Sequence, residues 1–196
     1  MSTDLSNLEN FLNVDVPTCK NANKNVDTTA DAKIDPIMIR DKAKSIGINI
    51  EPLDIYGVVK KLFLMDIREE DLGKSVSGFL ERIGERWCIY INKYESSLRK
   101  RFTIAHELGH FILHRDQIIA QGASAPDQVF FRSDDINSIE QEANNFASEL
   151  LMPENDFKCA IQKGDNTLEK LSNKFELSTM AVKYRAYKLG IISEYK

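Results

Sequence analysis

The sequence predicts a helix-rich α+β fold with one small β-sheet. Helix-periodic apolar runs fill most of the chain from residue 36 onwards, whereas "VSGFLERIGERWCIYIN" alternates on both sides of Gly84 as a β-hairpin does. No internal repeat is present. A chain of 196 residues, 42 % apolar and 29 % charged, suits one well-buried domain with additional segments.

The first 35 residues differ in composition from the rest. Residues 1–35 are rich in Asn, Asp, Thr and Lys, so we expect a disordered tail that buries too little apolar surface to fold. Order should begin at Asp35 and Pro36, an N-cap followed by proline at the first helical position, in a helix ending at Gly47. We expect the main domain to span 36–160.

The main domain should contain helices on both sides of the hairpin. The predicted elements are a helix after Pro52, a short strand at 63–67, hairpin strands near 76–83 and 86–92, a helix from 96 to 114, a loop over 115–135 and a helix over 138–152 ended by Pro153. On the second hairpin strand, Trp87, Ile89 and Ile91 face one side of the sheet.

The C-terminal segment, 161–196, reads as two helices joined at Glu176-Leu177-Ser178, in the manner of a helix-turn-helix. Lys183, Arg185 and Lys188 on the second helix are candidates for direct DNA contact. Two helices that pack on the main domain, or that dock a protein substrate, give the same pattern.

Composition excludes several classes of protein. A net charge of −4 argues against sequence-independent nucleic-acid binding by the whole surface. No apolar run approaches the roughly 18 residues that span a bilayer, and the acidic N-terminus is unlike a secretory signal. Three widely spaced cysteines favour a reducing compartment, so we expect a cytoplasmic protein without membrane partners.

All three histidines lie in "RFTIAHELGHFILH", residues 101–114. His106 and His110 are one helical turn apart, about 6 Å along the axis, so both imidazoles can reach one zinc ion. Glu107 lies beside them, where it can act as general base on a water held by the metal. His114 is about 12 Å beyond His106 along the helix axis, which is too far for both to bind one ion. We therefore expect His114 either to support a metal ligand or to lie at the end of the helix.

A catalytic zinc site needs a third protein ligand, and no histidine remains to provide it. In "SIEQEANNFASELLMP" the apolar face is bordered by Glu140, with Asn144 one turn further on as a candidate partner of a ligand. Periodicity places Glu142 on the solvated side with Asn145 and Glu149. Glu140 is therefore the predicted third ligand, although an acid at a helix edge is more often simply solvated.

These two motifs closely resemble those of the ImmA/IrrE family of bacterial zinc metallopeptidases, over roughly residues 50–192. The resemblance implies a zincin-like fold for 36–160, one Zn²⁺ ion held by His106, His110 and Glu140, and Glu107 as catalytic base. It also implies a regulatory endopeptidase whose protein substrate is a helix-turn-helix repressor of a phage, mobile-element, stress or antiphage locus. Residues 1–35 fall outside it.

Peptide hydrolysis also requires a group that stabilises the oxyanion. Tyr90, His114 and Arg132 are candidates that the sequence does not rank, and each could instead serve in packing or surface charge. The strand at 86–92 is a candidate for pairing with an extended substrate.

A cysteine thiolate in the fourth zinc position would keep such an enzyme latent. Cys88 on the hairpin and Cys19 in the tail are the candidate inhibitory thiols, against the plainer interpretation of ordinary buried or surface thiols.

Two other functions use related sites. A metal-stabilised sensor or regulator that binds DNA or protein without hydrolysis would not need Glu107 as a base, so Glu107→Gln separates it from a peptidase. A non-haem iron oxygenase also uses two histidines and a carboxylate, but its ligands usually lie on the strands of a barrel that this sequence lacks.

Overall fold

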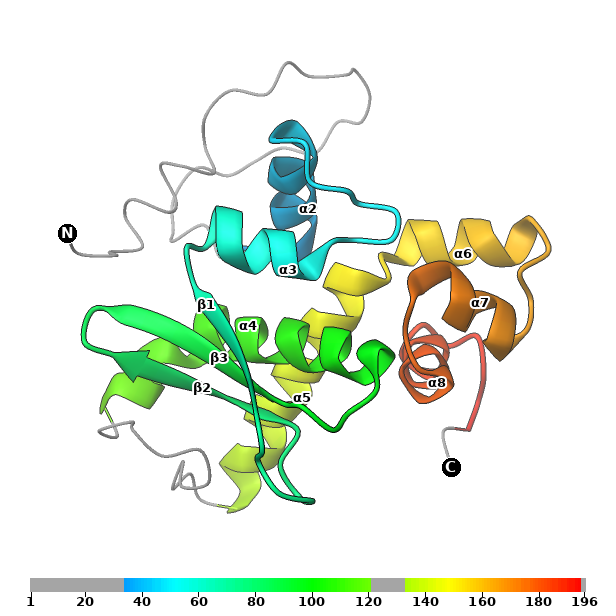
Figure 1. Ribbon diagram of the computed structural model, residues 1–196. Helices are drawn as coiled ribbons and strands as arrows, with labels where there is room; N and C mark the ends of the chain where they lie inside the picture. The colour runs from blue at the N-terminus through cyan, green and yellow to red at the C-terminus, as the bar shows by residue number, and fades with distance from the viewer. Residues whose placement is uncertain (1–33, 121–132, 195–196) are drawn as a thin grey trace, which may run out of the picture.

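The computed structural model describes residues 34–120 and 133–194. The described elements are α2 (Pro36–Ser45), α3 (Ile55–Gly57), the π-helix η1 (Val58–Leu62), β1 (Asp66–Glu70), β2 (Gly78–Ile83), β3 (Arg86–Asn92), α4 (Ser97–Ala120), α5 (Ser133–Leu151), α6 (Glu154–Gln162), α7 (Leu168–Phe175) and α8 (Thr179–Lys188) (Figure 1). The predicted class, α+β with one small sheet, is confirmed. Residues 1–35, for which the sequence predicts a disordered tail, lie almost wholly outside the described residues.

The three strands form one sheet in the order β1-β3-β2. Strand β2 pairs antiparallel with β3, as predicted for the hairpin, and β1 pairs parallel with the other side of β3. Gly84 takes a φ of +64° in the hairpin turn, a conformation that glycine adopts without steric cost. Both edges of β3 are therefore occupied, so the prediction that residues 86–92 pair with a substrate is wrong.

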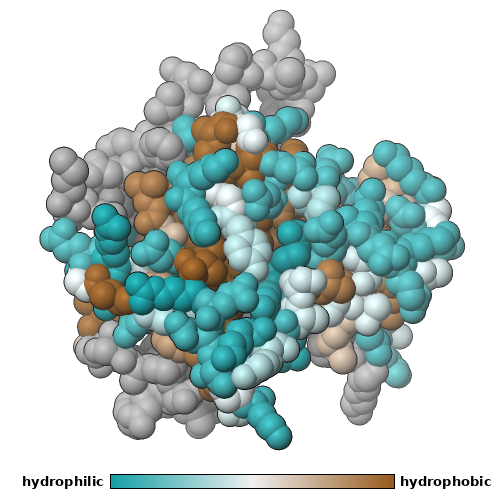
Figure 2. All heavy atoms as spheres, viewed as in Figure 1, coloured by the Kyte–Doolittle hydropathy of each residue, from teal (hydrophilic) through white to brown (hydrophobic). Residues whose placement is uncertain are grey.

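Helix α4 covers one face of the sheet. Trp87, Ile89 and Ile91 of β3 are buried in the core cluster that also contains Ile104 and Leu108 of α4, as the strand alternation predicted. The rings of Trp87 and Phe111 meet edge to face with centroids 5.6 Å apart. The strands pass in front of α4 in Figure 1, and Figure 2 shows that this outer side is largely hydrophilic, with smaller hydrophobic areas.

Helix α5 crosses α4 on the side away from the sheet, and Gly109 allows the close approach. A Cβ atom at Gly109 would lie 3.1 Å from Cδ1 of Phe146 and 3.3 Å from Cα of Ala143. Contacts this short require a neighbour to move, so glycine is the residue that lets the two backbones meet here.

The N-terminal helix starts where the sequence indicated. Asp35 caps α2 by accepting a hydrogen bond from the backbone N–H of Met38, and Pro36 occupies the first turn. The strand predicted at 63–67 begins three residues later, at Asp66. Leu64 interrupts it with a φ of +53°, and Phe63 and Met65 are buried in the core instead.

Two other boundaries were predicted wrongly. The loop over 115–135 is much shorter, because α4 continues to Ala120 and α5 already begins at Ser133. Ile118 explains the extension of α4, since it is buried in the same core as the preceding turns. Helix α6 was not anticipated, although Pro153 and two acids in the first turn are typical of a helix start.

The C-terminal helices α7 and α8 are joined at Glu176-Leu177-Ser178 as predicted. Glu176 adopts the left-handed conformation, and Ser178 caps α8 by accepting a hydrogen bond from the N–H of Ala181. Arg185 on α8 is buried and donates hydrogen bonds to the carbonyl of Met152 and to Glu149. One of the three cations considered for DNA contact thus packs against α5.

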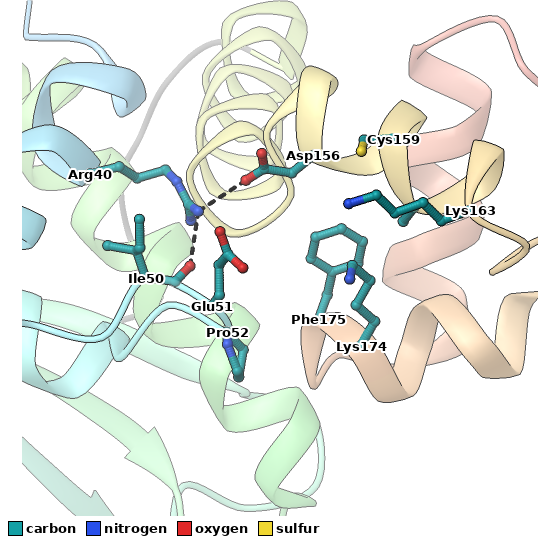
Figure 3. Close-up of a pocket in the computed structure, with 10 residues that line it drawn as sticks. Arg40, Ile50, Glu51, Pro52, Asp156, Cys159, Lys163, Lys174 and Phe175 are labelled. Atoms are coloured by element: carbon teal, nitrogen blue, oxygen red, sulfur yellow. Dashed lines mark hydrogen bonds and ion pairs between the residues drawn. The ribbon is translucent and has the colours of Figure 1, made fainter. Parts of the chain in front are cut away.

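A pocket of about 210 Å³ lies between α2, the loop at 50–52, α6 and α7 (Figure 3). Arg40 on its wall donates to Asp156 and to the carbonyl oxygens of Ile50 and Leu150, so this guanidinium joins three segments. None of the three histidines lines this pocket. No helix in the described ranges is long and apolar enough to cross a membrane.

Candidate metal centre

The imidazoles of His106 and His110 meet on the face of α4 that is turned toward α5. Their Nε2 atoms are 3.0 Å apart, as the spacing of one helical turn predicted. Both rings are mostly buried, with side-chain exposures of 16 % and 11 %. Helix α4 therefore presents two nitrogen donors to one point.

Glu140 of α5 completes the cluster. Its two carboxylate oxygens lie 3.2 Å from Nε2 of His106 and 3.2 Å from Nε2 of His110. Hydrogen bonds from the two histidines hold the pKa of Glu140 well below its usual range. His106, His110 and Glu140 form the group with metal-ligand geometry among the described residues.

The spacing of these three groups fits a small cation. Ligands about 2.0–2.1 Å from a tetrahedral zinc ion are separated by about 3.3–3.4 Å along the edges of the tetrahedron. The observed separations of 3.0 and 3.2 Å are close to that value. The side chain of Glu140 is half exposed, so the cluster opens to solvent on one side. Two imidazoles, one carboxylate and an open side suit a metal that also takes a water molecule or substrate.

Glu107 lies next to the cluster and is 7 % exposed. Burial raises the pKa of its carboxyl group, partly opposed by the neighbouring charges of His106 and His110. Within the described ranges its carboxylate accepts no hydrogen bond. A carboxylate in this state is available to take a proton from a nearby molecule.

The second ring nitrogens of both histidines also have partners. Nδ1 of His106 lies 3.1 Å from Oδ1 of Asn144, the residue that periodicity had placed one turn beyond Glu140. For His106, burial lowers the pKa, but the hydrogen bond with Glu140 and the charge of Glu107 outweigh it and leave the pKa raised. Nδ1 of His110 lies 3.1 Å from Nδ1 of His114.

His114 does not terminate its helix, because α4 continues for six more residues. It is 3 % exposed, and its Nε2 lies 3.3 Å from Oε2 of Glu142. Burial lowers the pKa of His114. Glu142 is exposed, as predicted for the solvated side, but its carboxylate also reaches across to His114 of α4.

The rest of that supposed solvated side also has partners. Asn145 accepts a hydrogen bond from the hydroxyl of Tyr184, and Glu149 forms an ion pair with Arg185. Periodicity within α5 identifies its two faces, but it does not reveal that α8 covers the second one.

Two of the other candidate residues, Cys88 and Tyr90, are not brought to the cluster. Cys88 and Tyr90 alternate with the α4-facing residues of β3, so their side chains lie on the opposite face of the sheet. Burial raises the pKa of the Cys88 thiol. Tyr90 stacks on Phe79 with centroids 4.6 Å apart, and its hydroxyl meets Arg68. Arg132 and Cys19 lie outside the described residues.

Sequence reasoning missed Gly109 and the pairing of Glu142 with His114. The position of Gly109 inside "HELGH" was a signal, because a glycine within a helix that is otherwise well formed often marks a close helix contact. No local signal identifies Glu142, since its contact depends on how α5 crosses α4.

A sheet-backed helix presents two histidines in register to a carboxylate, beside the buried Glu107. This is the arrangement expected of a metallopeptidase-like α+β domain. Comparison with known proteins specifies the family. The model of the M78 peptidases, described as the IrrE N-terminal-like domain, matches residues 61–187. The chain belongs to this ImmA/IrrE family of metallopeptidases, and membership implies a bound metal.

Two relatives illustrate the similarity. Metallopeptidase ImmA of Bacillus subtilis (strain 168) is 23 % identical over 160 residues, which cover 79 % of this chain and 88 % of that protein. A solved structure described as a Mycobacterium tuberculosis transcriptional regulator shares the fold, with a TM-score of 0.56 and 17 % identity. That match covers 78 % of this chain but 46 % of the regulator, so this chain spans less than half of its length.

Proposed function

We propose that this protein is a zinc-dependent regulatory endopeptidase, with His106, His110 and Glu140 as ligands and Glu107 as the catalytic base. The observation that carries the proposal is the convergence of two imidazoles and a carboxylate within 4.8 Å of one another, beside a buried glutamate. Membership of a metallopeptidase family supports it. Zinc is the metal most often held by two histidines and a glutamate in hydrolytic sites.

When bound, zinc polarises the scissile carbonyl and acidifies a water molecule. Glu107 takes a proton from the attacking water and then delivers it to the leaving amine. Its burial keeps the carboxylate poorly solvated and therefore more basic than an exposed one. With the proton of His106 on Nδ1, Oδ1 of Asn144 accepts its hydrogen bond and would hold Nε2 in the orientation that a metal ligand needs.

A substrate peptide in extended conformation would pair with the outer strand β2, because both edges of β3 are already paired. Of the two outer strands, β2 packs on α4, and its residues Gly78, Leu80 and Arg82 direct their backbone groups away from β3. An extended segment added at this edge would run beside the helix that carries the histidines.

We propose that the substrate is a protein, specifically a helix-turn-helix repressor. The resemblance of the two motifs to the ImmA/IrrE family and the similarity to metallopeptidase ImmA support this proposal. The cytoplasm is the compartment in which such a repressor acts. The three cysteines, which suit a reducing environment, agree with this location.

The test uses the zinc-loaded protein with helix-turn-helix repressors as substrates, starting with any that is encoded beside its gene. We expect cleavage that a chelator abolishes and that Glu107→Gln reduces by about 10²- to 10⁴-fold while bound zinc is retained. Asp116→Asn, which removes an 84 % exposed carboxylate from the same helix, is the matched control and should cleave normally.

Two outcomes would count against the proposal. Full cleavage by Glu107→Gln would remove the base from the mechanism. A biological effect that survives this substitution without any cleavage would favour the metal-stabilised regulator instead.

A further inference from the structure

The two histidines of the cluster have unlike hydrogen-bond partners. His106 meets the side-chain amide of Asn144, whereas His110 meets a third imidazole, that of His114. His114 in turn meets the carboxylate of Glu142. The contact between His114 and Glu142 connects α4 to α5 at a third residue of α5, in addition to Glu140 and Asn144.

Metal binding determines which ring nitrogens of His110 and His114 carry protons. If Nε2 of His110 is a ligand, its lone pair is used and the proton of the neutral ring resides on Nδ1. That N–H points at Nδ1 of His114, 3.1 Å away, which must therefore accept. The proton of a neutral His114 is then on Nε2, which donates to Oε2 of Glu142 at 3.3 Å.

The burial of His114 keeps its two hydrogen-bond partners in place. His114 is 3 % exposed, so water cannot easily replace either partner of its ring. The side chain of Glu142 is half exposed, so its carboxylate keeps contact with solvent while it accepts the hydrogen bond. Its second oxygen lies 3.5 Å from Oγ of Ser138, one turn earlier on α5, which restrains the carboxylate.

We propose that Glu142 and His114 are positioning residues that fix the tautomer and ring orientation of His110 through the chain Glu142–His114–His110. This rests on the proposed function, because it takes His110 as a metal ligand. This series of hydrogen bonds ends at the negative charge of Glu142, whereas the ring of His106 is supported by the neutral amide of Asn144. Nε2 of His110 is therefore the stronger electron-pair donor to the metal.

Metal binding itself provides the test. Purified wild type, His114→Phe, Glu142→Ala and the control Asp116→Asn are titrated with zinc against a chromophoric chelator. We expect His114→Phe to raise the dissociation constant about 10- to 100-fold and Glu142→Ala to raise it less. Phenylalanine keeps the ring bulk in the core but leaves Nδ1–H of His110 without an acceptor.

A spectroscopic measurement separates positioning from general damage to the fold. The Co²⁺-loaded proteins should show a changed visible absorption spectrum in His114→Phe and an unchanged one in Asp116→Asn, with equal helix content by circular dichroism. Should His114→Phe fail to fold, Glu142→Ala changes only a half-exposed side chain and carries the same test.

The zinc titration and the cobalt spectra distinguish failure of this inference from failure of the proposed function. Wild-type affinity and an unchanged cobalt spectrum in both Glu142→Ala and His114→Phe would overturn this inference alone. A wild-type protein that binds neither zinc nor cobalt would overturn the proposed function together with it.

Discussion

At the scale of single residues, the cluster follows from one helical period. His106 and His110 could be paired from their spacing, and Glu140 could be chosen because it borders the apolar face of its own helix. The partner of His114 could not be chosen in this way. Its contact with Glu142 arises from the crossing of two helices, which the period of either helix leaves undetermined.

Cys88 gives a prediction at this scale. It is buried on the sheet face turned away from α4, and burial raises the pKa of its thiol, so little reactive thiolate is present near pH 7. We expect iodoacetamide to alkylate Cys88 much more slowly than the exposed Cys159 in the folded protein. Peptide mapping by mass spectrometry measures the two rates.

Equal alkylation rates for the two thiols would show that Cys88 is accessible and would contradict its burial in the sheet. Unfolding the protein in denaturant provides the control, because both cysteines should then react alike.

At the scale of elements, the helices with clear caps were the easiest to predict. Asp35 and Ser178 accept hydrogen bonds from the first turns that they precede, and the hairpin turns at Gly84. Strand β1 was harder to place because Leu64 adopts a left-handed conformation in an apolar run that looks continuous. The central position of β3 depends on a parallel pairing with β1 that the sequence does not encode locally.

Gly109→Ala tests the contact between α4 and α5. Alanine gains about 1 kcal/mol in helix propensity, but overpacking at such a contact costs about 1–3 kcal/mol. We expect a lower free energy of unfolding and weaker metal binding, because a displaced α5 carries Glu140 with it. Urea denaturation and metal titration measure the two effects.

Gln117→Ala, on an exposed position of the same helix, is the control for this substitution. A Gly109→Ala protein that is more stable than the wild type and binds metal equally well would show that the helices do not need the close approach.

At the scale of the whole molecule, one core cluster includes Ile34 before α2 and Ala186 in α8. The boundary expected after residue 160 falls inside α6, where Ala160 is itself buried. The sequence could suggest a separate C-terminal segment because its helices are short and amphipathic. It could not show that Arg185 and Tyr184 attach them to α5.

This continuous core predicts that the metal is not needed for folding. A protein stripped with a chelator should keep its helical circular dichroism. Zinc at one hundred times its dissociation constant should stabilise it by about 2.7 kcal/mol, or roughly 5–10 °C in Tm. Differential scanning calorimetry with and without zinc measures the shift.

Glu140→Ala, which lacks one proposed ligand, should show a much smaller response to zinc. Loss of helical structure on chelation would contradict the prediction, because it would make the metal a structural requirement.

Helix α5 carries Glu140 on one side and the residues that meet α8 on another. Cutting the chain after residue 160 would therefore leave Glu149 without the guanidinium of Arg185 and Asn145 without the hydroxyl of Tyr184. A minimal version of this protein, for crystallography or engineering, has to extend through Lys188.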